Sequence, residues 1–265
     1  MKITVLGTGT STGVPSVACD CSTCRSSDPR DKRLRTSLLI QTASTTVVID
    51  TSMDFRQQML KHDVLDIDAV VFTHHHFDHI GGFDDIRPYN FRSGQPMQVY
   101  CLEETLQVLT STFPYAFGQI TSPGTSVPSV DVNVIDAAPF TVGDIDIIPI
   151  PLQHGTMRVN GYRFGNVAYC TDTNSIPPKS MELLRGLDTL ILDGLRWNPH
   201  PTHFNIEQAL EVVALLQPKR TYLTHIAHQL KHDETEERLP SHVRLAYDDL
   251  VVSSSSLEER SSSPS

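Results

Sequence analysis

Residues 73–82, THHHFDHIGG, crowd four histidines and one aspartate into six consecutive positions. Exposure on a surface turn does not explain so many groups that titrate near neutrality. Burial of these polar groups in a core without partners is energetically costly. Neutral imidazole and carboxylate are ligands for zinc, iron and manganese. The segment therefore predicts a metal site. The alternative, a solvated turn with incidental histidines, accounts poorly for this density of ligand types.

The number of donors predicts two ions rather than one. Four ligands in six positions exceed what one ion takes from a single loop, and His74 and His76 point the same way on an extended segment. Further donors are expected where strand-like segments end, and Asp172 among them is the natural carboxylate to bridge two ions. We predict one ion on His74, His76 and His154, and a second on Asp78, His79 and His225.

Short β-branched runs alternate with helical patterns along the chain, which predicts an α/β fold. Asn205 has the chemistry of an N-cap for the clearest helix. We predict one domain over residues 1–252, with a disordered polar tail over 253–265 and a loop or short strands over 118–139. The expected strands cover residues 3–7, 37–41, 45–50, 68–74, 145–154, 166–173, 188–194 and 220–225, and the helices 52–64, 103–113, 180–187 and 205–218.

The formal net charge of −10 restricts the partners. An acidic surface repels phosphate backbones, which disfavours a polynucleotide and favours a small-molecule substrate. The N-terminus lacks the apolar run and cleavage site of a signal peptide, and no stretch approaches the length of a membrane span. We therefore expect a cytoplasmic protein without a membrane partner.

Three of the five cysteines lie in CDCSTC, as Cys19, Cys21 and Cys24. Three thiolates bind zinc strongly and need one further ligand to complete a tetrahedron. His228 follows His225 by three positions, so one turn can present one histidine to each site. We predict a structural zinc here, with a reactive or simply reduced loop as the alternative. Cys101 and Cys170 lie in strand-like runs and are expected to be small buried hydrophobes.

These residues resemble a known family. THHHFDHIGG fits the H-x-H-x-D-H motif of the metallo-β-lactamase superfamily, and the order of the later ligands, the opening LGTGTSTGVP and the IDTS turn fit as well. The resemblance implies a four-layer αββα sandwich with the metals at one edge. CDCSTC, TDTNSIPP and LTHIAHQ are similar to the phosphoribosyl 1,2-cyclic phosphate phosphodiesterases of phosphonate breakdown, which carry a structural zinc and are commonly homodimers.

The resemblance implies hydrolysis of a small cyclic phosphate, either a phosphoribosyl 1,2-cyclic phosphate or a 2′,3′-cyclic nucleotide, by a hydroxide that two zinc or manganese ions activate. We expect Asp78 to act as both ligand and catalytic residue. His203, in a turn similar to that of ribonuclease Z, is the preferred general acid, and His200 is the second choice. Arg87 is expected to bind a phosphate, unless it pairs with a nearby aspartate. Asp50 is expected to orient a ligand histidine, or merely to stabilise its turn.

Three other functions remain open from the sequence. A ribonuclease Z-like tRNA 3′-processing nuclease uses the same motif, but the chain shows no basic arm to grip tRNA. A thioester or lactam hydrolase uses the same metals, although the cysteine cluster is not expected there. A metal-binding scaffold without activity is disfavoured because the ligand set is intact.

Overall fold

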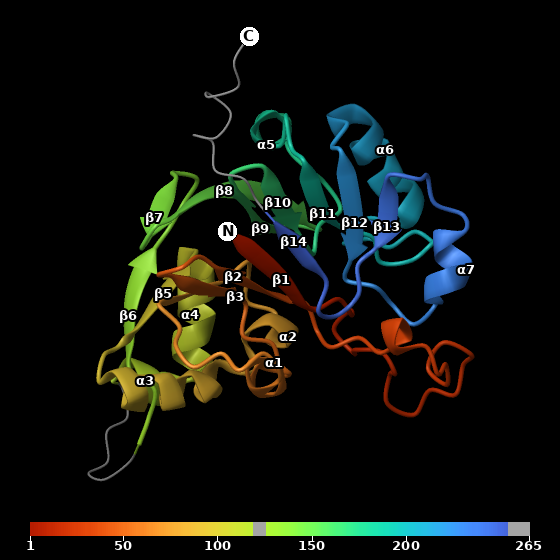
Figure 1. Ribbon diagram of the computed structural model, residues 1–265. Coiled ribbons are helices and arrows are strands. Elements are labelled where there is room, and N and C mark those ends of the chain that lie inside the picture. The colour runs from red at the N-terminus through yellow and green to blue at the C-terminus, as the bar shows by residue number, and fades with distance from the viewer. Residues whose placement is uncertain (119–125, 254–265) are drawn as a thin grey trace.

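The computed structural model describes residues 1–118 and 126–253, which form two seven-stranded sheets packed face to face (Figure 1). The first sheet has the order β14 (Val251–Ser253), β1 (Lys2–Gly7), β2 (Ser37–Gln41), β3 (Thr46–Ile49), β4 (Ala69–Val71), β5 (Met97–Cys101), β6 (Val130–Val134). The second has the order β13 (Val243–Leu245), β12 (Arg220–Thr224), β11 (Thr189–Asp193), β10 (Val167–Cys170), β9 (Met157–Phe164), β8 (Ile145–His154), β7 (Phe140–Val142).

The two sheets repeat one pairing pattern. In the first, β1, β2 and β3 pair antiparallel, and β3 to β6 then pair parallel. In the second, β7 to β10 pair antiparallel, and β10 to β13 pair parallel. The chain is thus built from two similar halves, with β14 returning to pair with β1. The parallel strands of both halves end at the same edge of the sandwich, where polar groups are expected to collect.

Side chains alternate between the two faces of each sheet, so the apolar interior forms three separate cores. One core lies between the two sheets, and one lies between each sheet and the helices that cover it. Ile40 and Val71 of the first sheet pack against Tyr162 and Ile191 of the second, between the sheets. The opposite face of the first sheet packs against helices α1 (Phe55–Lys61) and α4 (Glu103–Thr112), and that of the second against α5 (Pro178–Leu183) and α6 (Ile206–Leu216). The predicted α/β fold, a four-layer αββα sandwich, is therefore confirmed.

Most expected elements form, and α6 has the predicted cap. Asn205 Oδ1 accepts a hydrogen bond from Gln208 N, and Gln208 Oε1 accepts one from Asn205 N, which completes a capping box. The remaining helices are short: α2 (Phe77–Ile80), α3 (Arg87–Ser93) and α7 (His232–Glu236), with 3₁₀ turns η1 (Pro29–Asp31), η2 (Phe83–Ile86) and η3 (Pro114–Phe117).

Several strands of the structure were not predicted from the sequence. β9 pairs with both β8 and β10 although it contains the polar and glycine residues of MRVNGYRF. A Cβ on Gly161 would lie 2.6 Å from Tyr169 O, so the close approach of β10 requires glycine there. The sequence also missed β5, β7, β13 and β14.

Two predicted irregular segments are partly structured. Ser253, expected in the polar tail, lies in β14 and pairs with Lys2 of β1, and the rest of that tail lies outside the described residues. In the segment 118–139, β6 forms the edge of the first sheet, and residues 119–125 lie outside the described residues. Among the described residues, no helix is both long and apolar enough to traverse a bilayer.

Candidate metal centre

The seven donors expected to bind two ions meet at the sheet edge in two groups of four that share Asp172. Within each group the candidate ligand atoms lie within 4.8 Å of one another. The Oδ2 atom of Asp172 is 3.7 Å from His74 Nε2, 3.4 Å from His79 Nε2 and 3.3 Å from His225 Nε2. The groups are His74, His76, His154 and Asp172, and Asp78, His79, Asp172 and His225.

Local structure explains why these side chains converge. His74 lies just beyond β4, His154 ends β8, and Asp172 and His225 follow β10 and β12. The backbone after these last two strands turns sharply, since Asp172 has φ of 51° and His225 has φ of 57°. Non-glycine residues rarely adopt this left-handed conformation, and such strain clusters at functional sites.

Three of the ligand histidines are oriented by a hydrogen bond on the ring nitrogen that faces away from the site. His79 Nδ1 donates to Asp50 Oδ2 at 2.7 Å, and His154 Nδ1 donates to Thr202 O at 2.6 Å. The Thr73 hydroxyl donates to Asp50 Oδ2 and lies 3.0 Å from His74 Nδ1, so His74 Nδ1 donates to it. Each bond fixes the tautomer that leaves Nε2 free to coordinate.

The inward-facing nitrogens are the best test of whether a cation fits here. The Nε2 atoms of His74, His79 and His225 are buried and have no hydrogen-bond partner among the described residues. Buried polar atoms without partners are rare in folded proteins, and three that converge on two carboxylates require an unusual explanation. Divalent cations bound at these atoms would satisfy them, so these residues fit a metal centre.

Charge interactions within the group are strong. Burial disfavours an ionised Asp172, yet His225, His79 and His74 lower its pKa well below the usual range. Burial likewise opposes ionisation of Asp78, but His79 and His225 lower its pKa. Both carboxylates are therefore anionic at neutral pH, the form that binds cations. Burial lowers the pKa of His74, which keeps that ring neutral as a ligand.

A second histidine pair borders this centre. His203 is buried, and its Nδ1 donates to Asp193 Oδ2 at 2.7 Å. Its ring stacks on that of His225, with centroids 4.5 Å apart and planes 10° apart. His200 is more exposed, and its ring lies 5.0 Å from that of His203. The sequence reasoning missed Asp193 as a partner of His203, although it stands at the end of a strand just as Asp172 does.

Arg87 is engaged away from this centre. Its Nη2 lies 2.9 Å from Asp84 Oδ2, and its Nη1 donates to Ser126 O at 3.0 Å. This is the ion pair that the sequence left open as the alternative to phosphate binding. His75, the remaining histidine of the motif, belongs to neither donor group.

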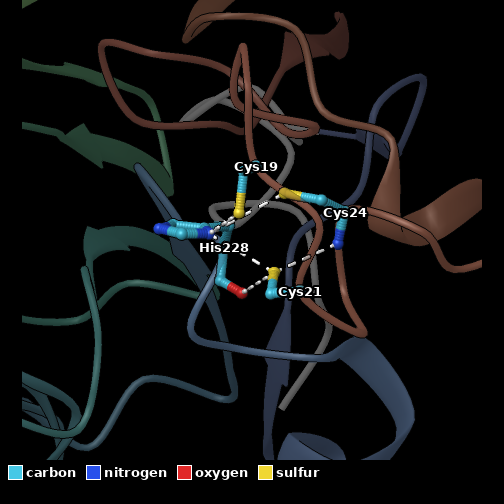
Figure 2. A group of neighbouring side chains, drawn as sticks. All are labelled: Cys19, Cys21, Cys24 and His228. Atoms are coloured by element: carbon cyan, nitrogen blue, oxygen red, sulfur yellow. Dashed lines mark hydrogen bonds between the residues drawn. The ribbon is translucent and has the colours of Figure 1, made fainter.

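The three cysteines of CDCSTC and His228 form a separate cluster (Figure 2). His228 Nδ1 lies 3.2, 3.4 and 3.7 Å from the sulfurs of Cys19, Cys21 and Cys24. The backbone N–H of Cys24 leads the interactions that lower the pKa of Cys21 to about 6, so this thiol ionises easily. Four soft or borderline donors in this arrangement fit a tetrahedral zinc. Cys101 and Cys170 are buried elsewhere.

The chain matches a known family and is similar in sequence to several known proteins. Residues 45–226 match the model of the β-lactamase superfamily domain. An octanoyltransferase of Porphyromonas gingivalis (strain ATCC BAA-308 / W83) is 39% identical over 94% of this chain, but the chain spans only about half of that relative, 51% of its length. The coenzyme PQQ synthesis protein B of Pseudomonas putida (strain KT2440) is 24% identical over 74% of both sequences.

Several solved structures have a similar fold. A diphosphatase from the PhnP family has a TM-score of 0.89 at 44% identity, with 95% of this chain and 97% of that one covered. Zinc-bound PqqB from Methylobacterium extorquens has a TM-score of 0.77 at 18% identity, covering 96% and 100% of the two chains. The short form of human tRNase Z has a TM-score of 0.66 at 17% identity, covering 96% and 99%. At these two lower identities the likeness concerns the fold alone.

Proposed function

The chain belongs to the β-lactamase superfamily and, within it, to the PhnP family, and from this membership we propose that it is a metal-dependent phosphodiesterase acting on a small cyclic phosphate. The observation that carries the proposal is the pair of donor groups joined by Asp172. If the two groups each hold a cation, the pair would stabilise both the attacking and the leaving oxygen of a displacement at phosphorus.

The proposed ligands are those of the two groups, and the proposed ions are zinc or manganese. When bound, such ions lower the pKa of a water and neutralise charge on the phosphate oxygens. Asp50 and Thr73 keep His79 and His74 oriented toward the centre. Asp78, which remains ionised, serves as a ligand and accepts hydrogen bonds from water at the site. A structural zinc on Cys19, Cys21, Cys24 and His228 completes the proposal.

His203 is the proposed general acid. Because its Nδ1 donates to Asp193, its Nε2 is the nitrogen available to carry a proton toward the leaving oxygen. The carboxylate of Asp193 also holds the ring in the orientation that this role requires, as in other His–Asp pairs. His200 is the less favoured candidate, since burial and neighbouring His203 lower its pKa and its Nδ1 faces Thr202.

A diphosphate is the second candidate substrate. The 44% identical relative of known structure is a diphosphatase, and cleavage of a P–O–P bond makes the same demands on metals and general acid as cleavage of a phosphodiester. The octanoyltransferase relative gives no comparable support, because this chain spans only about half of it. A small-molecule partner, a homodimer and a cytoplasmic location remain predictions.

A substrate panel tests the proposal. The zinc- or manganese-loaded protein is assayed with a ribosyl 1,2-cyclic phosphate, a 2′,3′-cyclic nucleotide, a dinucleotide diphosphate, a precursor tRNA, an acyl thioester and a chromogenic lactam. We expect turnover of the cyclic phosphates, with the same protein inactive after chelation. Preferred cleavage of the diphosphate selects the second candidate. Turnover of the thioester or lactam alone, or of tRNA alone, rejects both.

A further inference from the structure

His225 differs from the other buried ligand histidines in how its ring is held. Neither Nδ1 nor Nε2 has a hydrogen-bond partner among the described residues. His74, His79 and His154 each use Nδ1 to bond a threonine hydroxyl, a carboxylate or a backbone carbonyl. A ligand histidine almost always has such an orienting partner. The position of the His225 ring therefore depends on its backbone and on stacking, closely with His203 and at a longer centroid distance of 6.3 Å with His79.

The backbone of His225 is itself in an unfavourable conformation. Its φ of 57° lies in the left-handed region, which is unfavourable for a residue with a Cβ. Such a conformation persists only where the neighbouring structure over-determines it. The restraints on the following turn, residues 225–228, thus decide whether His225 reaches its ions.

Three backbone hydrogen bonds restrain the start of this turn. Ile226 N donates to Thr8 O at 2.8 Å, and Thr10 N donates to Ile226 O at 3.0 Å. Ala227 N donates to Leu195 O at 3.0 Å. The far end of the turn is His228, whose ring enters the cysteine cluster (Figure 2). One end of a four-residue turn thus carries a ligand of the catalytic centre and the other a ligand of the cysteine site.

The cysteine loop can transmit a restraint only once it is fixed. Val14 and Arg33 exchange backbone hydrogen bonds of 2.9 and 2.7 Å, which close the loop at its base. Beyond that base, the contacts of Asp31 and Arg30 reach His232 and Asp233, which lie past His228 in the chain. The loop reaches His228 itself through the cysteine cluster. There the three sulfur atoms lie 3.2 to 3.7 Å from His228 Nδ1.

We propose that His228 is a positioning residue and that the cysteine site is energetically coupled to the catalytic centre through residues 225–228. A cation on the three thiolates and His228 fixes the turn in the conformation that His225 needs, so filling this site raises the affinity of the catalytic centre for its ions. Linkage makes the effect reciprocal. The inference rests on the proposed metal centre but not on the proposed substrate.

The first test follows His225 directly in the full-length wild-type protein. Metal-free protein with ¹⁵N-labelled histidine receives one equivalent of ¹¹³Cd²⁺, whose chemical shift reports binding to thiolates, the softer ligands. We expect the His225 resonances to change from broad or multiple to single, while those of His154, anchored by Thr202, change little. His225 resonances that do not respond to a filled thiolate site overturn the coupling.

The second test measures zinc affinity by competition with a chromophoric chelator. We expect wild-type protein to bind three ions and His228→Ala to bind two, with the two weakened by about 5- to 150-fold, the usual range of coupling between sites. His228→Cys supplies a fourth thiolate and should restore the third ion and most of the affinity. His242→Ala removes an exposed histidine outside both clusters and should change neither value.

The outcomes separate this inference from the proposed function. Wild-type protein that binds no ions on the His/Asp groups refutes the proposed metal centre. Two ions bound by His228→Ala with wild-type affinity refute the coupling and leave the metal centre standing. If His228→Ala does not fold, the wild-type resonance experiment decides alone.

Discussion

The two donor clusters differ in what organises them. The His/Asp centre is drawn from the ends of several strands in both sheets, is mostly buried, and has orienting hydrogen bonds on three of its rings. The cysteine cluster comes from one loop and one turn, and Cys19 and Cys21 are partly exposed. The fold therefore orients most of the first cluster before any ion binds, with His225 as the exception, whereas the second cluster depends on its ion for order.

Removal of all metal should expose this difference most strongly. After treatment with a strong chelator we expect phosphodiesterase activity to fall to the background rate and limited proteolysis to cut within residues 15–32. The strands should stay protected, because their apolar layers need no ion. Mass spectrometry of the fragments locates the cuts. Activity that survives chelation, or first cuts within the strands, contradicts the comparison.

Loss of His203, the proposed general acid, should leave both clusters intact. We expect His203→Ala to lower kcat by about 10²- to 10⁴-fold, the usual contribution of a positioned acid. Metal analysis should show unchanged stoichiometry, since His203 belongs to neither group of four proposed ligands. His200→Ala is the matched control, for which a much smaller loss is expected. Equal losses in the two variants would count against the choice of His203.

Asp50 tests the orienting bonds that distinguish the first cluster. Asp50→Asn keeps an acceptor for Thr73 but removes the charge that faces His79 Nδ1 at 2.7 Å. We expect metal affinity or activity to fall by about 10- to 100-fold. The cysteine site should keep its zinc, as absorption of a cobalt-substituted sample will report. An unchanged affinity at the His/Asp centre would mean that Asp50 only stabilises its turn.

The sequence predicted those parts of the site that depend on local spacing or on strand ends. Residues 73–82 indicated a metal site through their density of histidine and aspartate alone. His154, Asp172 and His225 were predicted as further ligands because β-branched runs end beside them. The structure brings these three side chains together with four of the five donors of residues 73–82, leaving out His75. The αββα layers followed from the alternation of strands and helices together with the family resemblance.

What the sequence did not reveal depends on contacts between distant segments. β9 is a strand because β8 and β10 pair with it on both sides, which overrides the weak propensity of Asn160 and Gly161. The bond from His203 to Asp193 and the left-handed turn at His225 are likewise set by tertiary structure. Arg87 pairs with Asp84, a neighbour three positions away that the sequence offered but could not choose.

A pH-dependent effect on stability is expected at the base of the cysteine loop, which the fold holds without an ion. Arg33 is buried there, where Nη1 donates to Ala246 O and Nη2 donates to His232 Nδ1. Burial, aided by the charges of Arg33 and Arg30, lowers the pKa of His232 to about 4. Nearby, burial raises the pKa of Asp248 to about 6. These two groups should give opposite pH dependence to the free energy of unfolding.

The sign follows from which state binds the proton. Between pH 6.5 and 4 the unfolded chain protonates His232 before the native state does, so this group destabilises the fold on acidification. Between pH 6 and 4 native Asp248 takes up its proton first, which stabilises the fold. Relative to wild type, His232→Asn should therefore gain stability as the pH falls and Asp248→Asn should lose it, each by at most about 3 kcal/mol. Urea unfolding of metal-free protein measures both differences without ion release. Parallel profiles for the two variants would show that the loop base is not held by these buried groups, and the contrast between an ordered base and an ion-dependent tip would fail.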